Sequence, residues 1–449
     1  MFERWRKSGG EVAVLGLAKS GVAATLVLRQ AGFQVYASDK ASDPATEARA
    51  ESLRAAGATV ELGDHDLPRI GRATAVVVSP GVPPEVPALV AARRAGIEIV
   101  SELDVGAEAV QGARYAVITG TNGKTTTTAL VGHLLTTAGI TSLTAGNIGR
   151  PLCQVALDGE HPSWIALEIS SFQLHDTHYL VPDIGLLTNL APDHLDRYPT
   201  LEGYYADKRL LFRHATLSST WIVNGDDDAA VRMAEGVEGR QLRFSVRDRA
   251  DAWFDRSTSM LMLGDVTVVS RKDLSLLGDH NIANALAAVL VAEAAGAPLD
   301  GLRKGLVSFR ALAHRLEPVR EVGGVLWIND SKATNVASTT VAVAALDRPF
   351  VLLLGGRHKG EPYTGLLEPM GDRCRGVVAF GEARPLVVHD LAGRVPVTEA
   401  VTFGEVLSAA RALARPGDAV LLSPACSSYD MFKNYEDRGA QFRAAVEAM

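Results

Sequence analysis

The stretch that most constrains this chain runs from Tyr115 to Ala138 and reads YAVITGTNGKTTTTALVGHLLTTA. A short β-prone apolar run ends at Gly120, and apolar residues then recur at helical spacing from Leu130 onward. The order of strand, tight glycine turn and helix is typical of α/β proteins. Unpaired N–H groups and the helix dipole attract anions to such a helix start. The stretch therefore predicts an anion site.

The turn carries the residue types that hold a nucleoside triphosphate. Glycines let the backbone approach phosphate oxygens, Lys124 can reach a terminal phosphate, and the Thr125 hydroxyl can join the shell of Mg²⁺. The generic pattern has a further glycine where this chain has Ile118, so the loop is short. A glycine-rich turn that binds no nucleotide is the alternative. The predicted ATP-binding residues here are Gly120, Thr121, Asn122, Gly123, Lys124, Thr125 and Thr126.

Composition limits the classes of protein that this chain can represent. Its 449 residues suggest two to four domains, and 47% hydrophobic with 22% charged residues is ordinary for a soluble globular protein. The net charge of −7 argues against nucleic acid as a partner. The charged N-terminus has no long apolar stretch behind it, so we expect no membrane span and a cytoplasmic protein. The three scattered cysteines are expected to be reduced core residues.

The N-terminal region predicts a Rossmann-like domain. A β run from Glu11 is followed by a turn with Gly16, Ala18 and Gly21, then by a helix and a second strand that ends at Asp39. An acidic residue at this place usually meets a ribose hydroxyl. A nicotinamide dinucleotide is therefore an alternative ligand, on a loose fingerprint. A third apolar strand ends in a proline- and glycine-rich loop at Ser79.

Polar residues follow several strands of the central region. Asn147 lies in a glycine-bounded loop, and Glu168 ends an apolar run where an unpaired carboxylate is costly unless it binds a metal. His194 follows another buried strand, and a packed or surface histidine is its alternative. Lys208 lies in a helical pattern, where a lysine is ordinarily a solvated charge.

The last third of the chain again has predicted strands that are followed by polar residues. Asn281 and Asn284 lie near the start of a predicted helix that Asn281 caps, and they can contact a base or ribose or serve only as caps. Predicted strands that end in polar or glycine-rich loops lie within residues 323–335, 350–360, 377–381 and 419–439, and three of these strand ends are expected to carry function. Because the carboxyl ends of parallel strands meet at one edge of a sheet, we expect these loops to converge.

These motifs together resemble the Mur ligase family, whose members form amide bonds with ATP in peptidoglycan precursor synthesis. The motifs are GTNGKT, SSFQL after Glu168, DHLDRY around His194, HNIANALAA, NDSKATN and SPACSSYDMFKNYEDRG, and they cover nearly the whole chain. They look most like the members that add D-glutamate. The resemblance implies an ATP-dependent ligase that adds D-glutamate to UDP-N-acetylmuramoyl-L-alanine through an acyl phosphate, with two Mg²⁺ ions.

The resemblance also implies roles for single residues. Lys124, His194 and Lys208 would be catalytic, and Thr125, Glu168, His194 and a carbamylated Lys208 would hold the metals. His194 is in addition a candidate base for the amine. ATP would contact Asn281, Asn284, Arg315 and Asp330 besides the phosphate loop. The UDP-substrate would lie near Gly16, Asp39, Ser79 and Asn147, and D-glutamate near Lys332, Thr334, Lys359, Ser428 and Tyr435.

The implied architecture is α/β with three domains: a Rossmann-like domain over 1–110, a central P-loop-type ATPase domain over 111–313 and a Rossmann-like domain over 314–449. A hinge near residue 313 and a monomeric enzyme are expected. Tyr435 stands where the family pattern has Phe, and Arg357-His358 precede Lys359 where a smaller turn is common. A ligase for another amino acid, a folylpolyglutamate-type ligase, a nicotinamide dehydrogenase and a non-catalytic nucleotide-binding module are the alternatives.

Overall fold

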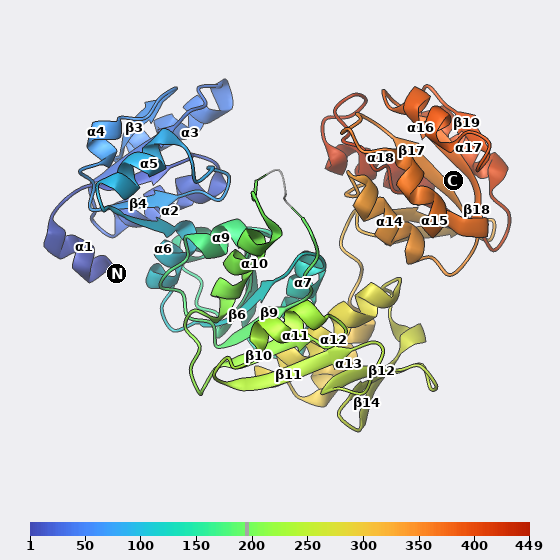
Figure 1. Cartoon of the computed structure of the whole chain (residues 1–449), viewed down its shortest axis with the longest axis horizontal. Helices are drawn as coiled ribbons and strands as arrows, with labels where there is room; N and C mark the ends of the chain where they lie inside the picture. Colours follow the sequence, from blue (N-terminus) through green and yellow to red (C-terminus); the bar gives the residue numbers. More distant parts are fainter. Residues whose placement is uncertain (194–196) are drawn as a thin grey trace. The chain divides into compact units, whose positions relative to one another are not determined.

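The chain forms three β-sheets flanked by helices (Figure 1), and this confirms the predicted α/β class with three domains. The structure is a computed structural model that describes residues 1–193 and 197–449. It divides into two compact units, one with residues 1–269 and 283–306 and the other with residues 270–282 and 307–449. The first unit contains two of the sheets. The boundaries at 110/111 and 313/314 stay predictions.

The first sheet is parallel and has the strand order β3-β2-β1-β4-β5, which confirms a Rossmann-like start. The order reverses beside β1, so the loop at Gly16 lies where such sheets bind ligands. The strands are β1 (Val12–Leu15), β2 (Val35–Asp39), β3 (Thr59–Leu62), β4 (Ala75–Val78) and β5 (Glu98–Ser101). The helices are α1 (Phe2–Ser8), α2 (Lys19–Gln30), α3 (Pro44–Ala55), α4 (Leu67–Ile70), α5 (Pro87–Arg94) and α6 (Glu102–Ala109).

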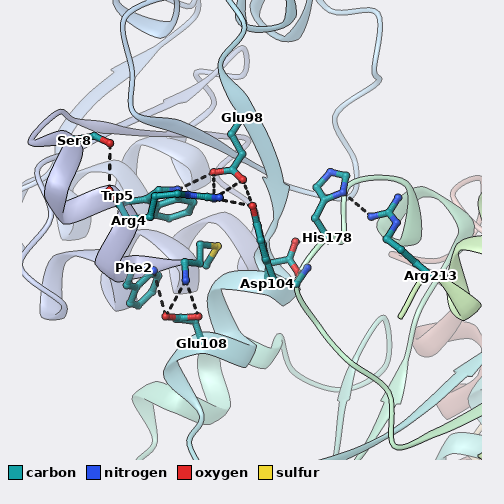
Figure 2. Close-up of polar contacts among 11 residues, drawn as sticks. Phe2, Arg4, Trp5, Ser8, Glu98, Asp104, Glu108, His178 and Arg213 are labelled. Atoms are coloured by element: carbon teal, nitrogen blue, oxygen red, sulfur yellow. Dashed lines mark hydrogen bonds and ion pairs between the residues drawn. The ribbon is translucent and has the colours of Figure 1, made fainter. Parts of the chain in front are cut away.

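Helix α1 is fixed to this sheet by polar contacts at both ends of its apolar face (Figure 2). Glu108 accepts hydrogen bonds from the N-terminal amine and from the Phe2 N–H, and Glu98 accepts from Arg4 and from the Trp5 indole. The aromatic rings of α1 are buried in the core of the first sheet. The N-terminus is therefore an ordered part of this domain.

The first sheet is joined to the second by hydrogen bonds to one buried carboxylate. Asp104, in the first turn of α6, accepts the backbone N–H groups of His178, Tyr179 and Leu180 at 2.7, 2.8 and 3.0 Å. Because a buried acceptor without a partner costs ~1–3 kcal/mol, this triple contact fixes the segment firmly on α6.

The second sheet has nine strands in the order β14-β13-β12-β11-β10-β9-β6-β8-β7. The strands are β6 (Arg114–Thr119), β7 (Ser142–Gly146), β8 (Trp164–Glu168), β9 (Ile184–Leu187), β10 (Thr220–Asn224), β11 (Arg240–Ser245), β12 (Ala252–Asp255), β13 (Met260–Leu263) and β14 (Val266–Ser270). The helices are α7 (Lys124–Thr137), α8 (Leu152–Leu157), α9 (Ser171–His175), α10 (Leu201–Arg209), α11 (Asp228–Ala234), α12 (Asp279–Ala294) and α13 (Leu299–Ser308). The functional strands β6, β8 and β9 are neighbours at its centre.

The third sheet has the order β15-β16-β20-β17-β18-β19, with only β15 paired antiparallel among its described strands. Its strands are β15 (Glu317–Val322), β16 (Val325–Asn329), β17 (Phe350–Gly355), β18 (Cys374–Phe380), β19 (Val397–Glu399) and β20 (Ala419–Leu422). Its helices are α14 (Val336–Ala344), α15 (Leu367–Met370), α16 (Arg384–Leu391), α17 (Phe403–Leu413) and α18 (Tyr435–Glu447). Leu352 and Leu353 of β17 lie in different hydrophobic clusters, because both faces of this sheet are covered.

One expectation about a single residue is wrong. Helix α12 begins at Asp279, so Asn281 lies inside its first turn and donates to the Leu277 carbonyl instead of capping the helix. Lys208 is buried, which excludes the alternative of a solvated lysine. The cysteines carry free thiols, as expected. Within the described ranges, no helix combines the length and apolarity needed to cross a membrane.

Candidate active site

The turn after β6 has the geometry of a phosphate loop. Gly120 and Gly123 have φ values of 140° and 81°, in the region that favours glycine, and Gly123 is the N-cap of α7. A Cβ on Gly120 would lie 2.0 Å from Thr188 Oγ1, so the neighbouring strand end leaves no room for a side chain. Asn122 is held by Asn189, which accepts its N–H at 2.9 Å and donates to its carbonyl at 3.0 Å.

Two lysines converge on this loop. Lys124 Nζ donates to the carbonyls of Gly120 and Thr121 at 2.9 and 2.8 Å, and Lys208 Nζ donates to the same Gly120 carbonyl at 2.7 Å. Two ammonium groups that share one acceptor would repel strongly, which disfavours a positive charge on both. The loop therefore brings two amines together where an anion would dock.

Burial makes Lys208 unusual among the lysines of this chain. Its side chain is 1% exposed, and it lies over the ring of Tyr204 at 4.7 Å. Desolvation, with repulsion by Lys124, lowers the pKa of Lys208 from 10.5 to about 6. The amine is thus largely neutral at physiological pH, so it can act as a nucleophile.

Glu168 provides a second unusual group. Its side chain is 1% exposed, and it lies opposite Ile118 where β6 pairs with β8. Ile118 precedes Gly120 by two residues. Its Oε1 accepts a hydrogen bond from Asn147 Nδ2 at 2.8 Å, whereas its Oε2 is buried with no hydrogen-bond partner in the structure. An orphaned buried carboxylate oxygen beside a phosphate loop fits a hard cation such as Mg²⁺.

His194 lies outside the described residues, so its predicted roles stay predictions. The flanking chain is held close to the phosphate loop, because Thr121 Oγ1 contacts both the Ala191 carbonyl and the Tyr204 hydroxyl at 3.1 and 3.2 Å. Among the described residues, no group of three histidine, cysteine, aspartate or glutamate side chains gathers as a metal site. Thr125 and Glu168 are the described oxygen donors.

Helix α12 brings its two asparagines to different places. Asn284 is buried against the phosphate loop, where its Oδ1 contacts Thr127 Oγ1 at 3.2 Å. A Cβ on Gly123 would lie 2.3 Å from that same Oδ1. Asn281 is also buried, one turn earlier on the helix.

The predicted UDP-substrate residues Gly16, Asp39, Ser79 and Asn147 line one cavity of about 800 Å³. Two of them hold the turn at Gly16 in place. Asp39 accepts the Leu17 N–H at 2.6 Å, and Ser79 Oγ donates to the Gly16 carbonyl at 2.7 Å. Residue-level reasoning missed Lys19, Lys40 and His65, which line the same cavity and suit an anionic ligand. Their positions beside the Gly16 turn, after Asp39 and after β3 were the available signal.

In the second unit, the loops after β16, β17 and β20 meet at one edge of the sheet, as predicted. Arg357 and Ser427 exchange backbone hydrogen bonds at 2.8 and 3.2 Å, which joins two of these loops. Asp330 accepts the Leu316 N–H at 3.1 Å and the Ser423 hydroxyl at 2.8 Å. Its burial raises its pKa to about 7. The predicted ATP residue Arg315 lies between His314 and Leu316, which have left-handed φ values of 64° and 42°.

Four of the residues predicted to bind the amino acid form two lysine–hydroxyl pairs on these loops. Lys332 Nζ donates to the Tyr435 hydroxyl at 2.8 Å and lies 4.0 Å from its ring centre. Lys359 Nζ donates to Thr334 Oγ1 at 3.3 Å. Ser428 is buried on the third loop. The edge thus offers ammonium and hydroxyl donors of the kind that a dicarboxylate requires.

Comparisons with known proteins agree along the whole chain. The family models "Mur ligase MurD-like, N-terminal domain", "Mur ligase middle domain" and "Mur ligase, glutamate ligase domain" match residues 10–101, 118–292 and 314–426. A protein of Acidobacterium capsulatum named UDP-N-acetylmuramoylalanine--D-glutamate ligase is 40% identical over 98% of this chain and 96% of its own length. A Bacillus subtilis protein of the same name is 36% identical, over 97% of each chain.

Solved structures share the fold. UDP-N-acetylmuramate-alanine ligase MurC of Thermotoga maritima superimposes with a TM-score of 0.61 at 16% identity, over 98% of this chain and 99% of that one. MurF of Acinetobacter baumannii gives 0.60 at 18% identity, over 98% and 92%. The glycine turn at Gly16, which alone suggested a dinucleotide, lies within the matched MurD-like N-terminal domain. Motifs, fold and full-length similarity agree, and the chain belongs to the Mur ligase family.

Proposed function

We propose that this chain is an ATP-dependent ligase that joins D-glutamate to UDP-N-acetylmuramoyl-L-alanine, in the cytoplasmic synthesis of peptidoglycan precursors. The observation that carries the proposal is the pair of lysines on the Gly120 carbonyl beside the orphaned oxygen of Glu168. Relatives that carry the name of this activity match nearly the full chain at 36–40% identity and support it.

The chemical problem in such a ligation is to bring two anions together. The alanyl carboxylate of the substrate attacks the γ-phosphorus of ATP, and the products are an acyl phosphate and ADP. The loop N–H groups at the start of α7 bind phosphate oxygens, and Lys124 leaves the loop carbonyls for the phosphates. These residues hold the two anions in line and offset their repulsion.

The metal-binding donors in this proposal are Thr125, Glu168, His194 and a carbamylated Lys208. Two bound Mg²⁺ ions would supply neutralisation of phosphate charge. The neutral, buried amine of Lys208 suits attack on CO₂, which forms an N–C bond and releases one proton. The product is a carbamate, which replaces a neutral amine by an anion with two oxygen donors next to Lys124. The carbamate of Lys208 would thereby attract the Lys124 ammonium, whereas a charged Lys208 would repel it.

The nucleotide base and ribose would lie against Asn281, Asn284, Arg315 and Asp330, and the uridine nucleotide would occupy the cavity at Gly16, Asp39, Ser79 and Asn147. D-glutamate would bind its two carboxylates with Lys332, Thr334, Lys359, Ser428 and Tyr435. Its amine then attacks the acyl carbon, the C–O bond to phosphate breaks, and an amine proton leaves to a base. The base is His194 or solvent.

We propose further that the enzyme is a monomer whose C-terminal domain closes at a hinge near residue 313. Left-handed φ values at two non-glycine residues, His314 and Leu316, each cost of order 1–3 kcal/mol and support a special role for this segment. Closure would keep water from the acyl phosphate. Small-angle scattering that shows no compaction with both substrates and an ATP analogue would contradict the hinge.

The test of the proposed function is phosphate release by the purified protein with ATP, Mg²⁺ and UDP-N-acetylmuramoyl-L-alanine, while the amino acid is varied. D-glutamate should give turnover, and L-glutamate and other amino acids far less. The Lys124→Ala variant should be inactive. Normal activity of that variant, or turnover with a different amino acid only, would overturn the proposal.

A further inference from the structure

The most deeply buried charge of the second unit is Arg438, whose side chain is 0% exposed. It lies on the first turns of α18 and points into the three loops at the carboxyl edge of the third sheet. Nε donates to Ser331 Oγ at 2.9 Å and Nη2 to the Ser331 carbonyl at 2.8 Å. Nη1 and Nη2 both donate to the Cys426 carbonyl at 3.2 Å. One guanidinium therefore binds the loops after β16 and β20.

The third loop packs against the same group. A Cβ on Gly356, in the loop after β17, would lie 3.2 Å from Arg438 Nη1, and the φ of Gly356 is 132°. The same Cβ would lie 2.2 Å from the Ser427 carbonyl, so the close approach of the loop after β20 requires glycine here. Arg438 thus bonds two of the three loops and lies close to the third.

One of the loops that Arg438 holds has a strained backbone. Ala425, next to Cys426, has a left-handed φ of 56°, which a non-glycine residue keeps only when its surroundings fix it. The Ser331 hydroxyl in turn donates to the Tyr435 carbonyl at 2.9 Å. The chain of contacts from Arg438 through Ser331 therefore ends at the backbone of the residue whose hydroxyl holds Lys332.

The charge itself is unusual. Each hydrogen-bond acceptor that the described residues give Arg438 is a neutral oxygen, and a buried cation without a bonded carboxylate is costly. Burial lowers the pKa of Arg438 to about 10, so the group still carries its proton near neutral pH. The nearby carboxyl groups of Asp430 and Asp330 raise the pKa of Arg438 and offset part of this cost.

We propose that Arg438 is the positioning residue of the acceptor pocket: it sets the relative placement of Lys332, Lys359 and Ser428. The inference rests on the proposed function, because the acceptor pocket is defined by it. Arg438 acts through the three loops and does not itself touch the amino acid. Its loss should weaken binding of the acceptor and leave the ATP loop in the other unit unaffected.

The test compares Arg438→Met with Phe442→Leu, a control on the same helix in which the altered ring is equally buried but packs against Trp327 away from the three loops. Arg438→Met should raise KM for D-glutamate by at least roughly tenfold, with KM for the UDP-substrate, which is assigned to the first unit, changed by less than about twofold. Phe442→Leu should lower the melting temperature with KM for D-glutamate unchanged. Arg438→Lys keeps the charge but not the fork and should fall between Arg438→Met and the wild type.

Three outcomes separate the possibilities. Equal KM changes for D-glutamate in Arg438→Met and Phe442→Leu would overturn the inference, because they would reflect general loosening. A wild-type enzyme without turnover on D-glutamate would instead refute the proposed function. If Arg438→Met does not fold, Ser331→Ala removes the Nε acceptor together with the hydroxyl bond to the Tyr435 carbonyl, keeps the Ser331 carbonyl, and should raise the same KM by about threefold. An unchanged KM in that variant would overturn the inference as well.

Discussion

Replacement of Lys208 by methionine should stabilise the folded protein while it removes activity. The folded chain must bury this amine, and the pKa falls from 10.5 to about 6. Near pH 7.5 the unfolded chain keeps the proton and the folded chain loses it, which costs ~1.4 kcal/mol for each of about three pH units, or ~4 kcal/mol. The hydrogen bond to Gly120 returns ~1 kcal/mol. Lys208→Met should therefore gain ~3 kcal/mol.

The sign of the pH dependence follows from the direction of the shift. Between pH 6 and 10.5 the unfolded chain binds more protons at Lys208 than the folded chain, so wild-type stability rises with pH across this window. The free-energy cost of removing the proton from Lys208 on folding shrinks to ~1.4 kcal/mol near pH 9.5. The advantage of Lys208→Met should therefore nearly disappear there.

The assay is thermal unfolding in buffers freed of CO₂, so that the lysine remains unmodified. A gain of ~3 kcal/mol corresponds to roughly 6–12 °C for a domain of this size. Lys304→Met, at an exposed lysine on α13, is the control and should shift the melting temperature little. Added bicarbonate should raise the melting temperature of the wild type only. The reasoning is refuted if Lys208→Met melts below the wild type near neutral pH, or if its advantage is the same at both pH values.

Further predictions concern the phosphate loop and one buried acid. Glu168→Gln keeps the bond from Asn147 but loses the anionic oxygen, so half-maximal turnover should need at least roughly tenfold more Mg²⁺; an unchanged magnesium titration would contradict this. Gly123→Ala should lose ATP affinity and ~2–3 kcal/mol of stability. Gly139→Ala, at the same φ of 81° but with open space around it, should lose only ~1 kcal/mol, and equal losses in a melting comparison would be evidence against a steric cause. Burial raises the pKa of Glu102 from 4.5 to about 7, so its contribution to stability is complete below pH 4.5 and lost as the pH rises through 7. The free energy of unfolding of Glu102→Gln, relative to that of the wild type, should therefore increase by ~3 kcal/mol between about pH 5 and 8, as measured by urea titration. A difference between the two proteins that does not change with pH would contradict the assignment.

The sequence alone determined the local structure and the order of the domains. The strand, turn and helix at Gly120 follow from residue spacing and from the demand for glycine at positive φ, both of which act over a few residues. Asp39 and Glu168 stand at strand ends, as the apolar runs before them predicted. The resemblance of the motifs extended this to family and reaction, because the motifs are themselves short and local.

Tertiary structure alone decided the burial of the charged side chains and therefore their pKa values. Lys208 has the sequence context of an exposed helical lysine, and its burial beside Lys124 depends on packing between α10 and the loop after β6, 88 residues away along the chain. The sequence pattern does not predict the role of Arg438 for the same reason, because its hydrogen-bond partners are up to 107 residues away along the chain. Desolvation and repulsion depend on distances in space, which residue spacing does not encode beyond one element. For that reason the sequence named the residues of the proposed site, and the fold set the protonation states of the buried ones.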